Sequence, residues 1–354
     1  MNFASDNVVG ASRPVMDALL RANEGAESSY GADSFTTRAT ARLAELFAHE
    51  VIVFMVATGT AANALALASL CPPWGAVFCH HLAHVANDEC GAPEMFTAGA
   101  KVVGIGGEDG RIAPDQFRAV LQAYPRGPVR RVQPGALSLS QATEMGTLYS
   151  VEQIAGLCNI AHEHGICVHM DGARFSNAVA ALGCRPADMT WKAGIDVLCF
   201  GASKNGALAC EAVVFFDPAR ADDFAFRAKR AGHILSKGRL FGAQMLAYLE
   251  DDHWLDLAHT ANTRAQQLAD LLTGVSGVRL AAQTPTNQVF VVLPRGMDAA
   301  LRSAGARYHE WDADGFAPAL QPSGDETFVR LVTSFATSAA DIEQFVSIAR
   351  GAAA

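Results

Sequence analysis

The sequence predicts an α/β fold built around a mostly parallel sheet. Short β-rich runs alternate with helical patterns through the first two-thirds of the chain, which is typical of βαβ units. After Glu250 the regular alternation of strand and helix patterns ends, and one long helical segment precedes a few short strands. At 354 residues the chain can bury one large core or a large and a small one, since single hydrophobic cores stop growing at about 250–300 residues. We therefore expect a large α/β unit followed by a smaller one.

The expected elements of the large unit follow in chain order. Strands are predicted at residues 51–56, 75–80, 100–105, 136–140, 166–171, 195–200 and 211–217, with helices at 60–70, 114–124 and 150–165. The helix at 150–165 is well delimited, because Ser150 and Gln153 form a capping-box pattern and Gly165 stands where a C-terminal glycine belongs. In the smaller unit we expect helices at 252–272 and after Ser338, and strands at 278–282, 287–293 and 327–335.

Charge and hydropathy argue against several classes of partner. The formal net charge is −9 and no block of Lys and Arg occurs, which argues against nucleic acid and anionic membrane surfaces. The longest apolar runs are far shorter than the roughly 18–20 residues of a membrane helix. The start has no leader-like pattern, and the eight cysteines are scattered without a Cys-x-x-Cys pair, which favours buried reduced thiols. We expect a cytoplasmic protein that acts on a small molecule.

One lysine has an unusual setting. Lys204 follows the predicted strand at 195–200 and stands among small residues between Gly201 and Gly206. Small neighbours let a flat ligand approach the backbone, and partial burial lowers the pKa of an amine toward the nucleophilic free base. A solvent-exposed lysine in a loop would have the same sequence pattern. Lys204 alone is therefore compatible with both a nucleophilic amine and an ordinary surface lysine.

Two further stretches point to the same chemistry. Asp171 ends the predicted strand at 166–171, at the sheet edge where ligands bind. A carboxylate there can keep the ring nitrogen of pyridoxal phosphate protonated, although capping of the following turn explains it equally well. Gly59 and Thr60 open an Ala-rich helix, where free N–H groups and the helix dipole suit a phosphate; ordinary capping by Thr58 is the alternative. Together with Lys204, this order of features specifies pyridoxal phosphate as the cofactor.

Several longer motifs run in order through the chain. They are "SDN" at 5–7, "YGAD" at 30–33, "TGTAANALAL" at 58–67, "DECGAPEMFTAGAK" at 88–101, "SLSQATEMGTLYS" at 138–150, "HMDGARF" at 169–175, "GASKNG" at 201–206 and "RLVTSF" at 330–335. The chain thus resembles the low-specificity L-threonine aldolases over nearly its entire length. The resemblance implies the aspartate-aminotransferase-like fold (pyridoxal phosphate fold type I), with a mostly parallel seven-stranded sheet flanked by helices. It divides the chain into an N-terminal arm (1–15), a large cofactor-binding domain (16–250) and a small α/β C-terminal domain (251–354).

The resemblance also implies which residues bind the cofactor. Lys204 matches the lysine that forms the Schiff base, and Asp171 matches the partner of the pyridinium nitrogen. Arg174 matches a neighbouring arginine that contacts the cofactor. Gly59 and Thr60 match the phosphate cup.

Other matching residues are implied to act on the substrate side or across subunits. His84 matches the histidine that stacks on the cofactor ring, and Arg330 matches the arginine that grips the substrate carboxylate. Ser5 lies in the arm that approaches the substrate. Tyr30, for the substrate, and Arg239, for the cofactor, match segments that subunits contribute to one another's sites. A homo-oligomer, as a dimer of dimers, is therefore expected.

The implied reaction is the pyridoxal phosphate-dependent retro-aldol cleavage of L-threonine, L-allo-threonine and related L-β-hydroxy-α-amino acids. Its products are glycine and an aldehyde, so the enzyme is a carbon–carbon lyase of the aldehyde-lyase type. A base must accept the β-hydroxyl proton; His84 is the candidate, with His81 or an ordered water as substitutes. A family member that prefers L-phenylserine is an alternative.

Alternatives from other enzyme classes depend on weaker patterns. His80, His84 and Asp88 would share one helical face and could hold a metal ion, but nearby glycine and proline and the strand-like "AVFCH" argue against that helix. The leading interpretation expects no metal. The glycines of "VVGIGGEDG" could suggest a nicotinamide dehydrogenase. A dinucleotide-binding motif opens a helix, however, and no helix pattern follows these glycines.

Overall fold

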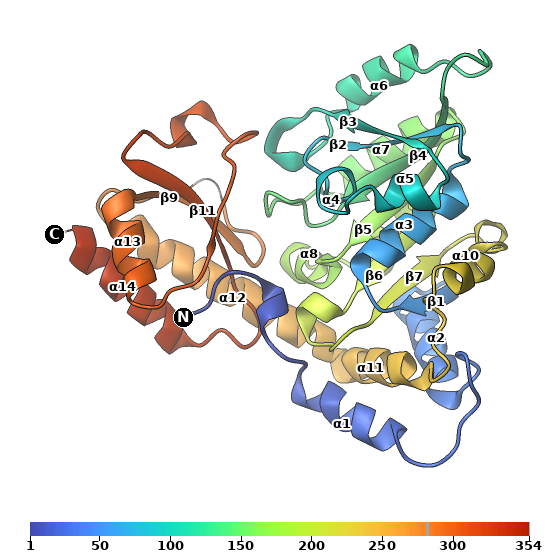
Figure 1. Cartoon of the computed structure of the whole chain (residues 1–354), viewed down its shortest axis with the longest axis horizontal. Helices are drawn as coiled ribbons and strands as arrows, with labels where there is room; N and C mark the ends of the chain where they lie inside the picture. Colours follow the sequence, from blue (N-terminus) through green and yellow to red (C-terminus); the bar gives the residue numbers. More distant parts are fainter. Residues whose placement is uncertain (281–282, 354) are drawn as a thin grey trace.

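A seven-stranded sheet forms the larger part of the protein. The computed structural model describes residues 1–280 and 283–353. The strand order is β1-β7-β6-β5-β4-β2-β3, and β7 is antiparallel to both of its neighbours while the pairs from β6 to β3 are parallel (Figure 1). The strands are β1 Ile52–Val56, β2 Gly75–His80, β3 Lys101–Ile105, β4 Gln133–Ser140, β5 Cys167–Gly172, β6 Val197–Gly201 and β7 Glu211–Phe215. The predicted mostly parallel α/β fold is confirmed.

Helices cover both faces of this sheet. One hydrophobic core lies under α2 (Ser34–Phe47), α6 (Pro114–Ala123), α7 (Val151–Glu163), α8 (Phe175–Leu182) and α11 (Arg239–Leu249). A second core lies on the opposite face, under α3 (Gly59–Leu70) and α10 (Phe224–Arg230). Parallel sheets require such double coverage because their strands are apolar on both sides. The shorter α4 (His84–Asn87) and α5 (Ala92–Phe96) lie between β2 and β3 in the chain, and α9 (Pro186–Met189) lies between β5 and β6.

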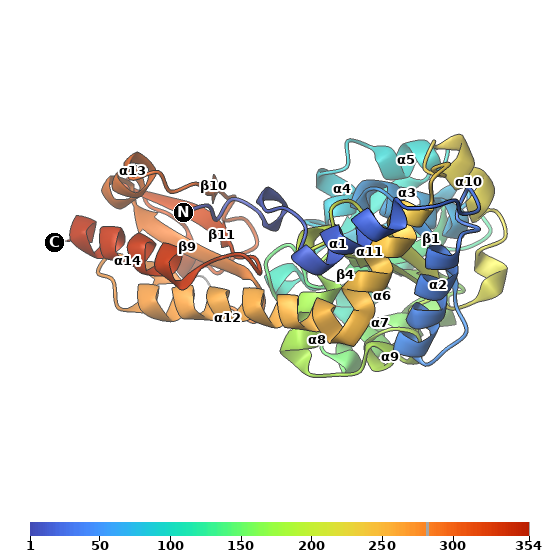
Figure 2. The same cartoon turned by 90° about the horizontal axis from the view of Figure 1, so that it is seen from below.

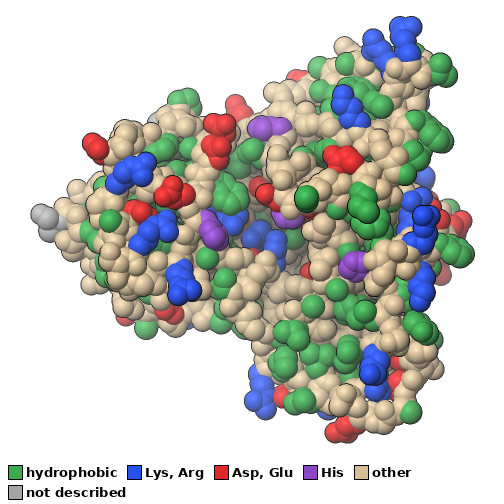
Figure 3. Space-filling model, in the orientation of Figure 1, with side chains coloured by type: hydrophobic (Ala, Val, Ile, Leu, Met, Phe, Trp, Pro, Cys, Tyr) green, Lys and Arg blue, Asp and Glu red, His purple; other side chains and the backbone are tan. Residues whose placement is uncertain are grey.

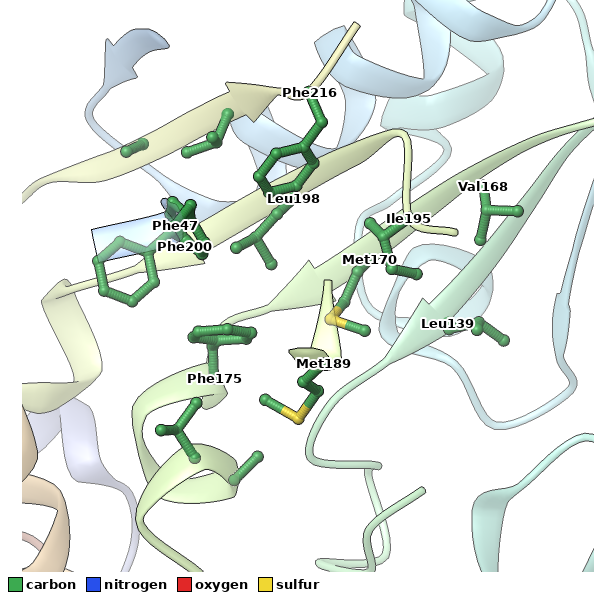
Figure 4. Packing of buried hydrophobic residues seen from close by; sticks show 14 of the residues in the cluster. Phe47, Leu139, Val168, Met170, Phe175, Met189, Ile195, Leu198, Phe200 and Phe216 are labelled. Atoms are coloured by element: carbon green, nitrogen blue, oxygen red, sulfur yellow. The ribbon is translucent and has the colours of Figure 1, made fainter. Parts of the chain in front are cut away.

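Aromatic side chains fill the first core. The ring of Phe47 lies 6.2 Å from Phe175, 6.3 Å from Phe200 and 5.3 Å from Phe216, measured between centroids (Figure 4). These four residues are the last residue of α2, the first of α8, a residue of strand β6 and the residue that follows β7. Full burial of such a side chain stabilises the fold by about 1.5–3 kcal/mol. The cluster therefore fixes β6, which leads directly to Lys204.

The capping pattern predicted for the helix at 150–165 is present. Ser150 Oγ accepts a hydrogen bond from the Gln153 backbone N–H at 3.2 Å, and Gln153 Oε1 accepts one from the Ser150 N–H at 2.9 Å. Gly165 follows the helix with a φ of +64°, a left-handed conformation that glycine adopts without strain. The residues at both ends of α7 therefore act as the sequence predicts.

Replacing Ser150 with alanine is expected to lower the free energy of unfolding by about 1 kcal/mol, because the capped N–H group loses its partner. Urea unfolding followed by circular dichroism measures this change. Ser303→Ala, at an exposed position at the end of a helix, is the control and should change stability by less than about 0.5 kcal/mol. Equal stability of the Ser150 variant and the wild type would contradict the prediction.

A four-stranded antiparallel sheet follows, in the order β10-β11-β9-β8. Its strands are β8 Arg279–Leu280, β9 Gln288–Pro294, β10 His309–Glu310 and β11 Glu326–Val332, and its helices are α12 His253–Thr273, α13 Arg295–Ser303 and α14 Ala339–Ala353. The two-residue β10 was not predicted, and β11 ends three residues earlier than predicted. The predicted strand at 278–282 falls partly on Ala281 and Ala282, which lie outside the described residues.

The first residues of the chain join the smaller sheet to the larger one. Phe3 is fully buried among residues of α14 and β11, and its N–H and C=O bond to Arg307 and Val332, both at 2.8 Å. The chain then passes through a short 3-10 helix, η1 (Asp6–Val8), to α1 (Arg13–Ala22) (Figure 2). The long α12 also runs from one part to the other. The domain boundaries at residues 15 and 250 stay a prediction.

Two further sequence expectations concern membranes and thiols. Among the described residues, the structure has no helix with the length and hydropathy of a bilayer-spanning segment. All eight cysteines are free thiols, and six of them are buried. The expectation of reduced cysteines therefore agrees with the structure.

Candidate active site

A cavity of about 530 Å³ opens at the carboxyl ends of the parallel strands. Its wall includes residues at or just beyond the ends of β4, β5 and β6, the start of α3, the N-terminal arm and strand β11. Figure 3 shows a hollow between the smaller and the larger part, in which basic side chains and histidines gather. Open parallel sheets bind ligands at this edge. Of the residues predicted for the site, those that line the cavity are Ser5, Gly59, Thr60, His84, Asp171, Arg174, Lys204 and Arg330.

Lys204 lies in the 3-10 turn η4 (Ser203–Asn205) that follows β6, and its side chain is half-buried. Burial lowers the pKa of its ε-amine, and the charge of Arg174 lowers it further, while Asp6 and Asp171 oppose this shift. The neighbouring glycine has a packing reason of its own, because a Cβ at Gly201 would lie 2.8 Å from the backbone of Ala173. The setting makes Lys204 a more nucleophilic amine than a surface lysine.

Asp171 is the buried carboxylate of the site. Its Oδ2 accepts a hydrogen bond from Asn63 Nδ2 at 2.9 Å, and its Oδ1 accepts one from the Ala173 N–H at 3.0 Å. Burial alone would raise the pKa of Asp171, but the charges of His84 and Lys204 and the Ala173 hydrogen bond outweigh burial and lower it. Asp171 therefore carries a negative charge in the neutral pH range.

Two buried residues that the sequence analysis did not single out hold His84 and Asp171 in place. Asn63, in α3, also donates from Nδ2 to Glu89 Oε1 at 2.8 Å. The same oxygen of Glu89 lies 2.8 Å from His84 Nδ1, and this hydrogen bond raises the pKa of His84. The sequence did contain one indication of a role for Asn63, because it is the single side-chain amide inside the otherwise largely apolar stretch "ANALALASL".

The amino end of α3 has the features of an anion site. Thr58 caps the helix, since its Oγ1 accepts a hydrogen bond from the Ala61 N–H at 3.2 Å. Gly59 and Thr60 line the cavity, and a Cβ built at Gly59 would meet no atom within 4 Å. Free N–H groups and the positive end of the helix dipole therefore face open space of the cavity, where a phosphate fits.

Two arginines enter the cavity from different parts of the chain. Arg174 forms a bidentate ion pair with the buried Asp6, at 2.8 and 3.1 Å. Arg330, in β11, stacks on Trp311 with its central carbon 3.8 Å from the ring centroid, and its buried Nε has no hydrogen-bond partner among the described residues. Burial lowers the pKa of Arg330 to about 10, so it stays charged. Arg330 is thus the arginine better placed to bind an additional carboxylate.

The remaining predicted residues have different positions. Ser5 lines the cavity and caps η1, with its Oγ accepting a hydrogen bond from the Asn7 N–H at 3.1 Å. His81 is exposed and lies outside the cavity wall, with its Nδ1 3.3 Å from the Ile105 carbonyl oxygen. Tyr30 is exposed beneath Lys229, and Arg239 donates to the carbonyls of residues 24 and 25. Within one chain, neither Tyr30 nor Arg239 reaches the cavity.

The metal site suggested by His80, His84 and Asp88 does not form. His80 is the last residue of β2 and His84 the first of α4, so they share no helical face. His80 is buried, its Nδ1 accepts a hydrogen bond from the Leu82 N–H at 3.2 Å, and burial lowers its pKa to about 4. Among the described residues, the group of three possible ligands within 4.8 Å of one another is His84, Glu89 and Asp171.

Comparison with known proteins places the chain in a family. A family profile described as "Beta-eliminating lyase" matches residues 2–295. The chain belongs to the beta-eliminating lyase family. Among its relatives in this lyase family, the low specificity L-threonine aldolase of Pseudomonas aeruginosa is 43% identical over 315 residues, which are 89% of this chain and 90% of that protein. The predicted resemblance to these aldolases, and with it the expectation of a lyase, is confirmed.

Solved structures of other proteins share the fold of this lyase. The threonine aldolase of Leishmania major matches with a TM-score of 0.92 and 27% identity, over 100% of this chain and 99% of that one. A serine palmitoyltransferase of Sphingomonas wittichii matches with a TM-score of 0.71 at 14% identity, over 99% of this chain and 86% of that one. The predicted aspartate-aminotransferase-like fold is confirmed.

Proposed function

We propose that this lyase cleaves L-threonine, L-allo-threonine and related L-β-hydroxy-α-amino acids to glycine and an aldehyde, with pyridoxal phosphate bound at Lys204. The observation that carries the proposal is that Lys204, Asp171 and the start of α3 meet at one cavity. It is supported by the 43% identity with a low specificity L-threonine aldolase. For threonine the aldehyde is acetaldehyde.

The residues present fit the cofactor. We assign Lys204 to the imine bond, Asp171 to the ring nitrogen, and Gly59 and Thr60 to the phosphate. The pKa shifts suit these roles, because a lowered lysine pKa favours the free amine and a lowered aspartate pKa maintains the negative charge beside a protonated ring. The open space at Gly59 is where the phosphate would lie. When bound, pyridoxal phosphate supplies an electron sink for a bond that breaks at the substrate α-carbon.

The chain's own residues orient the substrate. Arg330 binds the α-carboxylate through its guanidinium, which Trp311 holds in one plane by stacking. Fixing the carboxylate fixes which bond of the α-carbon is aligned for cleavage. His84 lies beside Asp171 and is held there through Glu89 and Asn63, so we assign it to stacking on the cofactor ring. Arg174, already paired with Asp6, adds positive charge next to Lys204.

A side-by-side assay tests the proposal. Purified protein is supplied with pyridoxal phosphate, and glycine formation is measured from L-threonine, L-allo-threonine, L-phenylserine and L-serine. We expect a yellow protein that cleaves the β-hydroxy amino acids and keeps its activity after chelator treatment. Faster cleavage of phenylserine than of both threonines would favour the phenylserine-preferring alternative. A colourless protein that forms no glycine from any of the four would refute the function.

Replacing Arg330 with lysine is expected to raise the KM for threonine by about 10–100-fold, because the bidentate grip and the stacking on Trp311 are lost. Initial rates over a range of threonine concentrations measure KM and kcat separately. Arg295→Lys, at an exposed position of α13, is the matched control. An unchanged KM in the Arg330 variant would exclude this residue from carboxylate binding.

We propose further that the active form is a cytoplasmic homo-oligomer, a dimer of dimers, in which Tyr30 and Arg239 serve the site of a neighbouring subunit. Tyr30 is 58% exposed and has a φ of +59°, so an otherwise unfavourable loop conformation presents an aromatic ring to the outside. Light scattering combined with an activity assay tests this assignment. A fully active monomer would contradict it.

A further inference from the structure

Besides Asp171, the cavity wall contains a carboxyl group that has one oxygen free. Glu144 follows β4 and belongs to the cavity wall. Its Oε1 is fixed by two donors, the Ser140 hydroxyl at 2.7 Å and the His84 backbone N–H at 2.8 Å. Its Oε2 is buried and has no hydrogen-bond partner among the described residues. One oxygen thus orients the carboxyl group, and the other remains available to a ligand.

A buried oxygen without a partner destabilises a protein unless a ligand or water satisfies it. The ligand expected in this cavity is a β-hydroxy amino acid, whose hydroxyl is both a hydrogen-bond donor and the group that must lose its proton. Burial raises the pKa of Glu144, and the charge of Asp171 adds to this shift, which makes Glu144 a stronger base than an ordinary glutamate. Its free oxygen therefore suits the hydroxyl chemically.

The other titratable groups of the cavity are less suited to accept a proton. His84 Nδ1 is bonded to Glu89, and the raised pKa of His84 favours the form that already carries its proton. Both oxygens of Asp171 accept hydrogen bonds. Burial raises the pKa of Glu211 to about 7, but Glu211 is hydrogen-bonded to the Ala202 N–H at 3.1 Å and to the Ser203 side chain, and it has no buried oxygen without a partner among the described residues. Asp88 lies at the exposed rim, where water screens it.

The surroundings of Glu144 leave few groups that can titrate with it. The titratable side chains that act on it or are acted on by it are Asp171, Cys79 and Tyr149, whereas His84 contacts it through its backbone N–H. Burial raises the pKa of Cys79 to about 12 and raises the pKa of Tyr149, so both stay neutral. A titration in the working pH range that disappears with Glu144 can therefore be attributed to its carboxyl group.

We propose that Glu144 is the general base that accepts the β-hydroxyl proton of the substrate at Oε2, an inference that rests on the proposed aldolase function. In this step the hydroxyl O–H bond breaks and its proton moves to Oε2. The electron pair of that bond forms the carbonyl group of the departing aldehyde. Pyridoxal phosphate held at Lys204 would supply the sink for the electron pair of the broken Cα–Cβ bond, and that pair would bind the proton that the α-carbon takes up to give glycine. His84 keeps the stacking role.

The test separates this step from the rest of catalysis. Glu144→Gln is expected to lower kcat for threonine cleavage by about 10²–10⁴-fold. Exchange of the α-hydrogen of glycine with solvent needs the cofactor, Lys204 and Arg330 but no β-hydroxyl proton transfer, so it should stay near the wild-type rate. Glu94→Gln is the matched control, because Glu94 also has a buried oxygen without a partner but lies outside the cavity wall. Its rates for both reactions should match the wild type.

A further measurement does not depend on turnover. Infrared titration of the holoenzyme should show carboxyl groups that lose their protons above the ordinary glutamate range, Glu211 and Glu144 among them, and the contribution of Glu144 should be missing in Glu144→Gln. A second variant, Glu144→Ala, is assayed for cleavage with and without added formate, which can replace the missing carboxylate. We expect formate to raise the cleavage rate and to leave glycine exchange unchanged.

Several results would overturn the inference. A fall in cleavage of less than about tenfold in Glu144→Gln would exclude a general base at this position. Equal losses of cleavage and of glycine exchange would indicate a structural role. A formate response that is the same in wild type and Glu144→Ala would also count against it. If the wild type itself cleaves no β-hydroxy amino acid, the proposed function fails, whereas active wild type with an equally active variant refutes Glu144 alone.

Discussion

Replacing Lys204 with alanine is expected to reduce threonine cleavage by at least about 10⁴-fold, to the background rate, while leaving the fold intact. The half-buried amine lies at the end of β6, which the cluster around Phe200 fixes independently of the lysine side chain. Glycine and aldehyde formation measure the rate, and circular dichroism checks the fold. Borohydride should attach the cofactor to Lys204 in the wild type, and peptide mapping locates the label.

Lys101→Ala is the matched control, because Lys101 is exposed at the start of β3. Its activity and colour should equal those of the wild type. A label on a different lysine, or an active Lys204 variant, would rule out the assigned imine bond.

Asp171→Asn is expected to lower kcat by about 10²–10³-fold, because the neutral amide cannot keep the cofactor ring protonated. Folding lowers the pKa of Asp171 below its ordinary value of 3.8, so the wild-type carboxylate is already ionised well below neutral pH. The loss in the variant should therefore be the same at about pH 7 and about pH 9. Rates at saturating threonine over this range provide the measurement.

Asp115→Asn, in the first turn of α6, is the control for removal of one exposed negative charge and should have no effect on kcat. If the loss in Asp171→Asn grew or vanished between these two pH values, Asp171 would titrate in the working range. The assigned role beside the ring nitrogen would then be wrong.

The main strands of the larger sheet could be predicted because each is a short apolar run with buried residues on both faces, as in β2, β5 and β6. The ends of α7 were predictable for another reason, since Ser150 and Gln153 act within one turn. By contrast, β10 contains only the exposed residues His309 and Glu310, which have no apolar pattern. Sequence patterns therefore predicted the strands that are buried on both faces and the helix ends that are capped by neighbouring residues.

The network around the site could not be predicted, because it joins distant parts of the chain. Asn63 meets Asp171 across 108 positions, and Asp6 meets Arg174 across 168. The free oxygen of Glu144 depends on where two other donors lie, which no spacing in the sequence reveals. The alternative metal site failed because it assumed that His80, His84 and Asp88 lie on one helix. In the structure β2 ends at His80 and α4 begins at His84, so no single helix contains these residues.

The position of the N-terminal arm has a practical consequence for handling this enzyme. Phe3 is buried in the smaller sheet while Asp6, three residues later, is bonded to Arg174, and the terminal amino group lies 3.6 Å from Asp341. Replacement of Phe3 by a small residue would therefore loosen the arm from the smaller sheet and disturb the Asp6–Arg174 pair next to Lys204. Phe3 is accordingly a position to leave unchanged when the enzyme is engineered.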